Sequence, residues 1–337
     1  MSADGTNTSR QLLRESFFSF RAPGEILRNA PSVCFPMIQR TTCPISGDPS
    51  EVIFSRPYAL PEMRAYTDRC RLTDKLAQTP YEIRFCPTSG LHFQTWVMDE
   101  SELAGLYSPP ADAKSFMEQI GKYKLHWFAH MTEEILVMRQ MIAATTPVVL
   151  DFGCNWGKWA SMALAHGCDT YGLDVNRDAA AFCASRGIKM LAPDQLGVNR
   201  FDFINVDQVM EHLTDPLAVA RTLAAALKPG GFIKLGTPDN PRLPQQLRAA
   251  QERGSNSILD AKAIDSLYPL EHVNLFNHAS LRLLGERVGL REAKLPFFKW
   301  LGAGQLWNIP RQLNRNLTTP WKRMMGRGPY IWLQKPS

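Results

Sequence analysis

From Val148 onward, short apolar runs alternate with helical stretches, and this alternation constrains the fold more than any other feature. The run at 148–152 (VVLDF) is almost continuously apolar, which is typical of a strand buried on both faces. Further strands are predicted at 170–174, 188–191, 201–206 and 232–237, and helices at 156–166, 177–186 and 215–227. Strands that alternate with helices predict an α/β fold with a doubly wound, mostly parallel sheet.

A glycine turn lies where the first of these strands passes into a helix, in the stretch from Leu150 to Gly157 (LDFGCNWG). In doubly wound sheets, ligands bind at the carboxyl ends of the strands, and glycine lets the backbone approach a ligand closely. A nicotinamide fingerprint reads G-x-G-x-x-G, whereas Gly153 and Gly157 are four residues apart with Asn155 between them. The spacing therefore disfavours a dinucleotide.

This turn resembles the first motif of the class I S-adenosylmethionine-dependent methyltransferases, which reads roughly D-x-G-x-G-x-G. The resemblance extends over residues 148–240, and its further motifs are Asp174, Val206–Pro216, Leu227–Gly231 and Gly236–Asp239. These motifs are specific in combination, although a glycine turn alone is a weak signal. The resemblance implies a Rossmann-like sheet of seven mostly parallel strands, methyltransferase activity and S-adenosylmethionine as the cofactor. The alternative is an α/β domain without a cofactor.

The resemblance also implies which residues hold the cofactor. The methionine moiety would be held by Asp151 and by the backbone of Gly153, Cys154, Asn155 and Gly157. Asp174 would take the ribose hydroxyls, as an acidic residue some 20 residues after a glycine turn commonly does. Val206 and Asp207 would close over the methionine end.

The adenine would be bordered by Val175. In the family, an aspartate near the end of the third strand often faces the adenine amine, and Asp194 is the nearest match. Ala192 is the alternative occupant of that position.

The chain departs from the family at the middle glycine of the first motif, where Asn155 stands. If that position needs a positive φ, asparagine is the least costly residue other than glycine. Cofactor binding would then survive, with an amide side chain close to the cofactor.

A Glu-His pair follows the fourth predicted strand, where the acceptor would arrive. Methyl transfer is a displacement at a carbon that the sulfonium already activates, so the protein supplies alignment and, where the acceptor loses a proton, a base. Histidine is easily tuned to accept a proton near neutral pH, which makes His212 a candidate base with Glu211 beside it. The alternative is that the pair only structures its loop.

Gln208 bears on whether this pair binds a metal. The stretch resembles the ubiquinone-biosynthesis O-methyltransferases, in which a glutamate three residues before the Glu-His pair completes a metal site. Gln208 stands at that position, and an amide is a poor substitute for a carboxylate on a hard cation. We therefore expect no metal.

A second pair, Glu271 and His272, follows an insertion at 241–270 and opens the run EHVNLFNH. Many small-molecule methyltransferases that this chain resembles carry such a run before a late helix. His272 could reach over the pocket from a lid and act as the base. The alternative is a loop-fixing hydrogen bond, with His278 at the surface.

The front of the chain is predicted to contain a loosely docked arm at 1–40 and a small module with a linker at 41–120. Two knuckle-like sequences, Cys43–Ser46 and Cys86–Gly90, resemble the zinc-ribbon module that precedes many bacterial methyltransferases. Those modules bind zinc through two cysteines in each knuckle, but the second cysteine of each is a serine here, and a protonated hydroxyl is a poor zinc ligand. We expect a degenerate ribbon, with the shape but without the metal.

The methyltransferase domain is predicted to span 121–337. It opens with a helical stretch at 121–144, in which apolar residues recur every three or four positions. Its last two strands are predicted at 290–296 and 330–335, and the resemblance implies that the terminal strand is antiparallel.

The basic excess of the chain lies between these last two strands, in an insert at 297–327. The insert has three tryptophans, no Asp or Glu, and six cations, and the rest of the chain has 32 basic and 32 acidic residues. Such a segment can lie on an anionic membrane surface or grip the phosphates of a phosphate- or lipid-linked acceptor. The alternative is a solvated excursion whose tryptophans pack on the sheet.

Other features limit the class of function. Seven scattered cysteines, and no apolar run long enough for a signal peptide or a membrane span, predict a cytoplasmic protein. The net charge of +6 is mild and disfavours a nucleic-acid partner. The leading hypothesis is methyl transfer to a small-molecule acceptor, at oxygen. The alternatives are a non-catalytic binding module with this fold and, third, an RNA methyltransferase.

Overall fold

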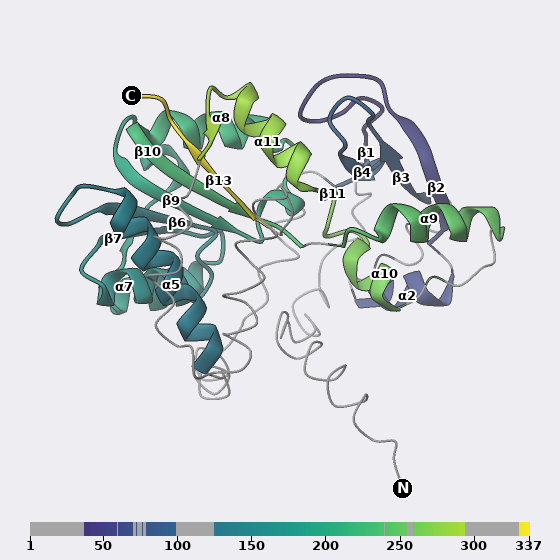
Figure 1. The fold of residues 1–337 in the computed structure, drawn as a ribbon. Helices are drawn as coiled ribbons and strands as arrows, with labels where there is room; N and C mark the ends of the chain where they lie inside the picture. The colour runs from purple at the N-terminus through teal and green to yellow at the C-terminus, as the bar shows by residue number, and fades with distance from the viewer. Residues whose placement is uncertain are drawn as a thin grey trace, which may run out of the picture.

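The computed structural model describes residues 37–58, 60–69, 72, 76, 79–98, 125–238, 240–254, 259, 261–293 and 330–337. Most of the predicted arm, the linker from residue 99 to residue 120 and the whole basic insert at 297–327 lie outside these residues. The described chain forms two lobes, one around a seven-stranded sheet and the other around a four-stranded sheet (Figure 1).

The larger lobe contains the predicted doubly wound sheet. Its strands, in spatial order, are β12 (Arg291–Glu292), β13 (Tyr330–Gln334), β10 (Leu227–Gly236), β9 (Phe201–Asp207), β6 (Val148–Phe152), β7 (Asp169–Leu173) and β8 (Lys189–Met190). From β10 to β8 all neighbours are parallel, while β13 is antiparallel to both β10 and β12. The structure confirms the seven-stranded, mostly parallel sheet and its antiparallel terminal strand.

Helices cover both faces of this sheet. On one face lie α5 (Leu125–Met141), α6 (Lys158–Ala165) and α7 (Arg177–Ser185), and on the other lie α8 (Pro216–Ala226) and α11 (His278–Arg287) (Figure 1). Two of these helices begin at a side chain that caps their first turn. The Asn176 side chain accepts hydrogen bonds from the amides of Asp178 and Ala179, and Asp215 caps α8 through the Ala218 amide at 2.9 Å.

The core of the larger lobe is apolar on both faces of the sheet. Burial of these side chains is the main favourable contribution to folding, at about 25 cal/mol per Å² of apolar surface. On the α5–α6 face, the Phe203 ring lies between Trp159 and Trp332, with centroid distances of 5.7 Å and 5.0 Å. This packing holds the central strands in place, and with them the edge of the sheet where their carboxyl ends lie.

The smaller lobe is built from two distant parts of the chain. Its antiparallel sheet has the order β11 (Asn274–Leu275), β4 (His92–Gln94), β3 (Pro80–Phe85) and β2 (Glu51–Pro57), beside the short pair β1 (Ile38–Gln39) and β5 (Trp96–Val97). Its helices are α2 (Pro61–Arg69), α9 (Leu243–Glu252) and α10 (Ala261–Leu267). One apolar cluster joins residues of the front module, such as Phe54 and Ile83, to Leu247 and Leu267 of the insertion. The insertion at 241–270 therefore shares a core with the front module.

The two knuckle sequences meet in this lobe. The Cys43 thiol lies 3.2 Å from the Ser89 hydroxyl, and the Ser46 hydroxyl lies 3.7 Å from the Cys86 thiol. Each knuckle closes through a backbone hydrogen bond from the following glycine amide to the cysteine carbonyl. Thiol–hydroxyl contacts thus join the knuckles, and the expected absence of zinc stays a prediction.

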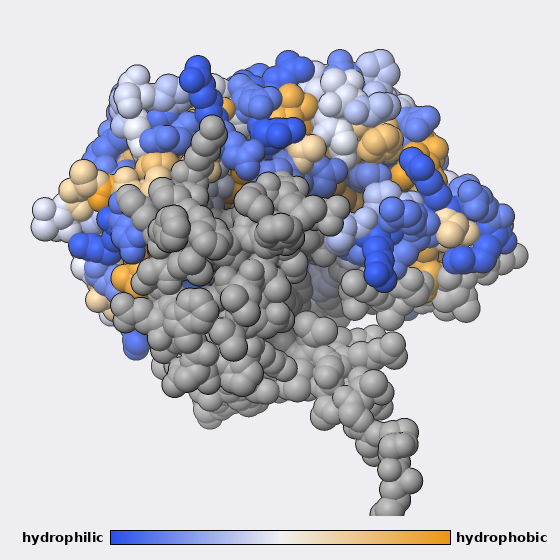
Figure 2. All heavy atoms as spheres, in the orientation of Figure 1, coloured by the Kyte–Doolittle hydropathy of each residue, from blue (hydrophilic) through white to orange (hydrophobic). Residues whose placement is uncertain are grey.

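The face of the molecule seen in Figure 2 is dominated by hydrophilic side chains wherever the described residues are visible, with small scattered apolar areas. Among the described helices, none combines the length and the apolar character needed to cross a bilayer.

Candidate functional site

The glycine turn follows β6 and adopts a left-handed backbone at three positions. The φ angles of Gly153, Asn155 and Gly157 are 72°, 48° and 70°. A Cβ on Gly153 would lie 2.4 Å from Val209, and one on Gly157 would lie 2.7 Å from the Cys183 thiol. Both glycines are required, and Asn155 takes the positive φ that its place in the motif suggested.

Asp174, which directly follows β7, is hydrogen-bonded to the glycine turn. Its carboxylate accepts the Asn155 amide at 2.6 Å and the Asn176 amide at 2.8 Å. Burial raises the pKa of Asp174, while these amide hydrogen bonds act in the opposite direction. The end of β7 and the turn after β6 are thus one structural unit.

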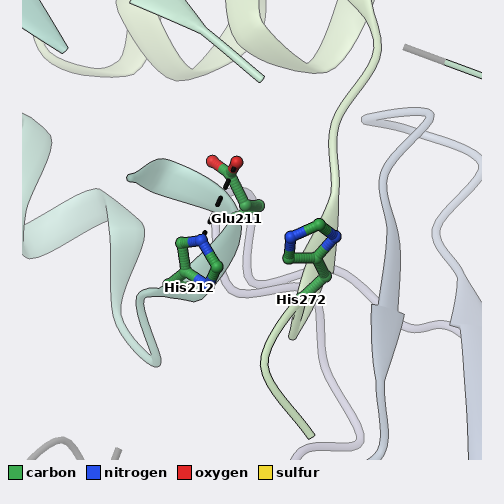
Figure 3. A group of neighbouring side chains, drawn as sticks. All are labelled: Glu211, His212 and His272. Carbon is green, nitrogen blue, oxygen red and sulfur yellow. Dashed lines mark ion pairs between the residues drawn. The ribbon is translucent and has the colours of Figure 1, made fainter. Parts of the chain in front are cut away.

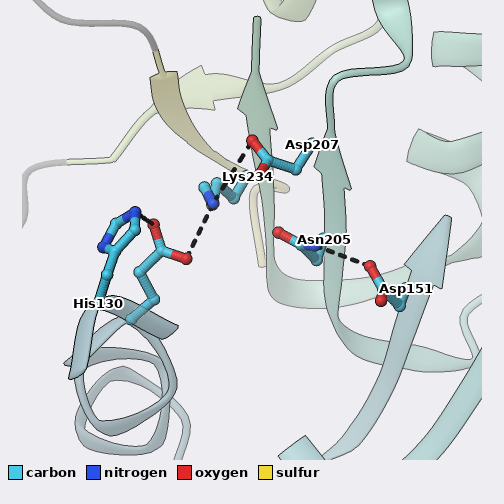
Figure 4. Close-up of polar contacts among 6 residues, drawn as sticks. His130, Asp151, Asn205, Asp207 and Lys234 are labelled. Carbon is cyan, nitrogen blue, oxygen red and sulfur yellow. Dashed lines mark hydrogen bonds and ion pairs between the residues drawn. The ribbon is translucent and has the colours of Figure 1, made fainter. Parts of the chain in front are cut away.

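Asp151 lies beneath the turn and is only 4% exposed. One carboxylate oxygen accepts a hydrogen bond from Asn205 Nδ2 at 2.8 Å (Figure 4). The other accepts a hydrogen bond at 3.1 Å from the amide of Ala160, in the first turn of α6. Burial raises the pKa of Asp151 to about 7. Asn205, in the middle of β9, is a polar partner that sequence reasoning missed; an amide inside the apolar run FDFINV was its only signal.

A second buried polar group lies on the α5 side of β10, and sequence reasoning missed it as well. The Lys234 ammonium lies 2.9 Å from Glu134 and 3.8 Å from Asp207, and His130 contacts Glu134 at 3.2 Å (Figure 4). Burial alone would lower the pKa of Lys234, but the Asp207 and Glu134 carboxylates raise it above its ordinary value. The ammonium therefore stays charged and ties α5 to the end of β9.

The other predicted cofactor residues lie along the same edge of the sheet, because the carboxyl ends of parallel strands meet there. Val175 is 58% exposed beside Asp174, and Asp194 is exposed on the 3₁₀ turn η2 (Pro193–Gln195) after β8. By contrast, the side chains of Cys154 and Val206 are buried in apolar clusters. Only their backbone can face a ligand.

The two Glu-His pairs, which are far apart in sequence, meet in space. Glu211 and His212 lie on the 3₁₀ turn η3 (Met210–His212) after β9, and His272 lies just before β11 (Figure 3). The two imidazole rings are 4.9 Å apart between centroids, and Glu211 Oε1 lies 3.9 Å from His212 Nε2. One potential ligand atom from each of the three side chains lies within 4.8 Å of the others.

Backbone carbonyls fix the tautomer of both histidines. His212 Nδ1 lies 2.9 Å from the Glu271 carbonyl, and His272 Nδ1 lies 3.2 Å from the Ser266 carbonyl. Because a carbonyl only accepts, each Nδ1 must carry the hydrogen, and each Nε2 keeps its lone pair. Glu271 therefore contributes its backbone carbonyl to the cluster.

Burial sets the charge of the three side chains. It lowers the pKa of His212 to about 3, and burial together with the neighbouring His212 lowers the pKa of His272 to about 3. Burial also raises the pKa of Glu211 well above its usual range. Neither carboxylate oxygen of Glu211 has a hydrogen-bond partner on another described residue. At neutral pH both imidazoles of the cluster are therefore neutral.

The same donor set, two imidazoles and a carboxylate, is one that zinc and related cations take. Gln208 adopts a positive φ of 58°, and its backbone amide donates to the Gly236 carbonyl at 2.9 Å. The expected absence of a metal stays a prediction. His278 lies outside the cluster, with its Nε2 2.9 Å from Glu292 Oε1 and its side chain 15% exposed.

Comparisons with known proteins show which family the chain belongs to. A family model described as a methyltransferase domain matches residues 126–294, about half of the chain. The ubiquinone biosynthesis O-methyltransferase of Bordetella avium is 25% identical over 150 residues, which cover 41% of this chain and 58% of that protein. The corresponding Aliivibrio fischeri protein is 31% identical over 100 residues, covering 26% and 43%. The chain thus spans about half the length of these curated relatives.

Among solved structures, an S-adenosylmethionine-dependent methyltransferase from Mesorhizobium loti aligns with 61% of this chain and 100% of its own, at 18% identity and a TM-score of 0.39. The match to the family model begins in α5 and ends just after β12, so it takes in the glycine turn, the strand edge and both Glu-His pairs. The chain belongs to the family of S-adenosylmethionine-dependent methyltransferases.

Proposed function

We propose that this protein transfers the methyl group of S-adenosylmethionine to a hydroxyl oxygen of a small-molecule acceptor. The observation that carries the proposal is the convergence of two neutral imidazoles and a carboxylate at the strand edge that also holds the glycine turn. The curated relatives are named as O-methyltransferases, which supports oxygen as the methylated atom.

On the cofactor side, the positive-φ backbone from Gly153 to Gly157 would receive the methionine part, with Asp207 closing over it. Asp174 would accept the ribose hydroxyls through the lone pairs that its two amide partners leave open. Asp151 would act from below the turn, since both of its oxygens already accept hydrogen bonds.

The adenine would lie against the exposed side chain of Val175, which offers an apolar surface at the end of β7. Asp194, on the neighbouring turn η2, would accept the adenine amine. Val206 would contribute through its backbone, because its side chain is buried in the core.

On the acceptor side, the imidazoles would remove the hydroxyl proton. When bound, S-adenosylmethionine supplies a methyl carbon whose bond to sulfur breaks as the acceptor oxygen attacks, which releases S-adenosylhomocysteine. His212 Nε2 would receive the proton, since the His212 side chain is 14% exposed and His272 is almost fully buried. His272 would pack against the ring of His212, with the Glu211 carboxyl group beside His212 Nε2.

The test is a screen of acceptor classes with S-adenosylmethionine labelled in its methyl group. Catechols, phenols, sugar hydroxyls, amines and short RNA would be compared by mass spectrometry. We expect the label on the oxygen of a small hydroxylated acceptor. Transfer to RNA or to nitrogen alone, or no transfer to any class, would contradict the proposal.

Asn155 supports one alternative, a binding module that retains the fold without catalysis, because its amide side chain extends from the turn where the family has glycine. Calorimetry with S-adenosylmethionine separates the two functions. The proposed enzyme binds the cofactor and turns over, whereas the module shows no measurable binding.

A divalent cation on Glu211, His212 and His272 is a second way to activate the acceptor. Bound there, a cation would polarise the acceptor oxygen and lower the pKa of its hydroxyl. The donor set fits, because the carboxylate of Glu211 is buried without a hydrogen-bond partner on another described residue.

The basic insert at 297–327, outside the described residues, would dock a phosphate- or lipid-linked acceptor or an anionic membrane surface. Its six cations and three tryptophans support this proposal. Flotation with anionic liposomes at low salt should recover the protein, and high salt should release it. Absence of binding at both salt concentrations would remove the membrane contact.

A further inference from the structure

Arg40, between the short strand β1 and the first knuckle, is 8% exposed and contacts the acceptor side of the site. Its Nε and Nη2 donate to the Gln94 carbonyl at 3.2 Å and 3.0 Å, and Nη2 also donates to the Val273 carbonyl. Its Nη1 donates to the side chain of Asn274 at 2.9 Å and to the Thr214 carbonyl at 3.4 Å. All five N–H groups of the guanidinium therefore have acceptors.

Asn274 continues this network toward the imidazoles. Its Oδ1 accepts from Arg40, and its Nδ2 donates to the carbonyls of Met210 and Leu213 at 3.1 Å and 2.7 Å. Those two carbonyls flank Glu211 and His212 on η3. Asn274 is completely buried, so its hydrogen bonds do not compete with bulk water.

Gln94, in β4, holds the backbone of His272, the residue that carries the other imidazole. Its side-chain amide donates to the His272 carbonyl at 3.0 Å, and its backbone amide donates to the Val273 carbonyl at 3.0 Å. The side chain of Gln94 is 1% exposed. His272 and η3 are thus tied to the front module through separate, buried hydrogen bonds.

We propose that Arg40 and Asn274, with Gln94, are positioning residues for methyl transfer: through them the front module sets the His212–His272 geometry. This inference rests on the proposed function. It gives the front module a role that does not require zinc, because the contacts come from Arg40 and β4.

A guanidinium suits this position better than an ammonium does. Its five donors have a fixed planar geometry, and here they reach acceptors on four residues: Gln94, Thr214, Val273 and Asn274. Lysine would keep the charge but has only three donors on a flexible stem. Arg40→Lys therefore removes the geometry and retains the charge.

The test compares Arg40→Lys and Asn274→Asp with wild type. Asn274→Asp keeps an acceptor for Arg40 and removes the two hydrogen bonds donated to η3. In both variants we expect kcat to fall about 10- to 100-fold, because a displacement of about 1 Å at reacting groups has effects of that size. The dissociation constant for S-adenosylmethionine should stay within about twofold, since the glycine turn lies outside the network.

The second readout is the ¹⁵N NMR signal of the His212 ring. Wild type should show a single tautomer with the hydrogen on Nδ1, whereas the variants should show a mixture, because the Glu271 carbonyl is no longer held against η3. This readout needs no acceptor. It therefore tests the network even if the screen finds no methylated product, in which case only the proposed function fails.

Arg84→Lys is the matched control. Arg84 belongs to the same module, and its side chain donates to the hydroxyl and the carbonyl of Ser50, at 2.8 Å and 2.6 Å. We expect wild-type kcat and wild-type His212 signals in this variant. Equal losses in Arg84→Lys and Arg40→Lys would show a general structural effect and overturn the proposal.

Unchanged His212 signals in both test variants would also overturn it. If Arg40→Lys fails to fold, Asn274→Asp alone tests the proposal. If both variants fail to fold while Arg84→Lys folds, Gln94→Glu is measured in the same way. Loss of the donor to the His272 carbonyl should then shift the His272 signals, and unchanged signals would contradict the proposal.

Discussion

The two sides of the site are assembled in different ways. The cofactor side comes from one continuous stretch, in which the turn after β6 and Asp174 after β7 share a hydrogen bond across 19 residues of chain. The acceptor side comes from segments far apart in sequence: Arg40 bonds to Asn274 across 234 residues, and Gln94 bonds to His272 across 178. A local motif can specify the first side, whereas only the tertiary fold assembles the second.

The difference also extends to solvent. Val175 and Asp194 on the cofactor side are exposed, while Glu211, His272 and Asn274 on the acceptor side are buried. An open cofactor cradle suits a ligand that enters and leaves in each turnover. A buried cluster suits neutral imidazoles, because burial is what keeps their pKa low.

Among the changes on the cofactor side, the largest effect is expected from damage to the cradle. Gly157→Val places a β-branched residue at φ 70° with its Cβ 2.7 Å from the Cys183 thiol. Such backbone strain costs about 1–3 kcal/mol, equivalent to about 5- to 150-fold in affinity. Calorimetry should show S-adenosylmethionine binding weakened to that degree, with the His212 NMR signals unchanged.

Gly254→Val is the matched control for that variant. Gly254 also has a positive φ, of 94°, but among the described residues other than its chain neighbours no atom lies within 4 Å of its hypothetical Cβ. Its backbone strain lies away from the turn, so cofactor binding should match wild type. Equal weakening in both variants would refute a specific role for the turn.

The buried imidazoles predict a distinctive pH dependence of stability. Burial lowers the pKa of His272 to about 3 in the folded protein, against about 6.5 for an exposed imidazole. Between these values the unfolded chain binds more protons, so this contribution is fully present above pH 6.5 and is lost as the pH falls toward 3. His272→Gln lacks it, and urea unfolding should show the variant gaining stability relative to wild type across that window.

His166→Gln, at the end of α6 and outside the cluster, serves as the control for that comparison. A difference between His272→Gln and wild type that stays constant from pH 7 to pH 4 would mean that His272 is not held neutral. The low pKa of His212 has a parallel consequence for activity: kcat should not fall as the pH decreases through 6.5.

A smaller effect is expected beneath the turn. Asn205→Leu removes the hydrogen bond to Asp151 and leaves a buried carboxyl oxygen without its partner. The free energy of unfolding should fall by about 1–3 kcal/mol, measured in urea. Catalysis at saturating cofactor should change little, since Asn205 lies on the cofactor side. A clear fall in kcat at saturating cofactor would show that Asn205 also affects the acceptor side, and that the two sides are not independent.

The smallest expected effect is that of chelation. If an imidazole is the base, dialysis against a chelator leaves kcat unchanged and elemental analysis finds no stoichiometric metal. A loss of activity that added cation restores would instead assign the activation to a cation on Glu211, His212 and His272. If the protein keeps stoichiometric zinc and full activity after dialysis against the chelator, the zinc would be assigned to the knuckle cysteines.

The sheet and the cofactor side can be predicted from the sequence, because the residues that form them are close together along the chain. The alternation after Val148 predicts the sheet, and the spacing of Gly153, Asn155 and Gly157 predicts the turn. Asn205 and Lys234 were missed because a single polar residue in an apolar strand does not reveal its partner. His212 and His272 were each identified, but their meeting depends on β11 pairing with β4, which no local pattern encodes.

The insertion at 241–270 is a further case of this limit. Its helices α9 and α10 bury Leu247 and Leu267 against side chains of the front module, such as Phe54. An amphipathic helix shows in its sequence which face is apolar but not which surface covers that face.

The role of His212 is tested most directly by the single-turnover rate of methyl transfer by His212→Ala with S-adenosylmethionine bound in advance. We expect a rate about 100- to 10,000-fold below that of wild type, as for loss of a general base. The dissociation constant for the cofactor should be unchanged. A wild-type rate in His212→Ala, and likewise in His272→Ala, would contradict an imidazole base on the acceptor side.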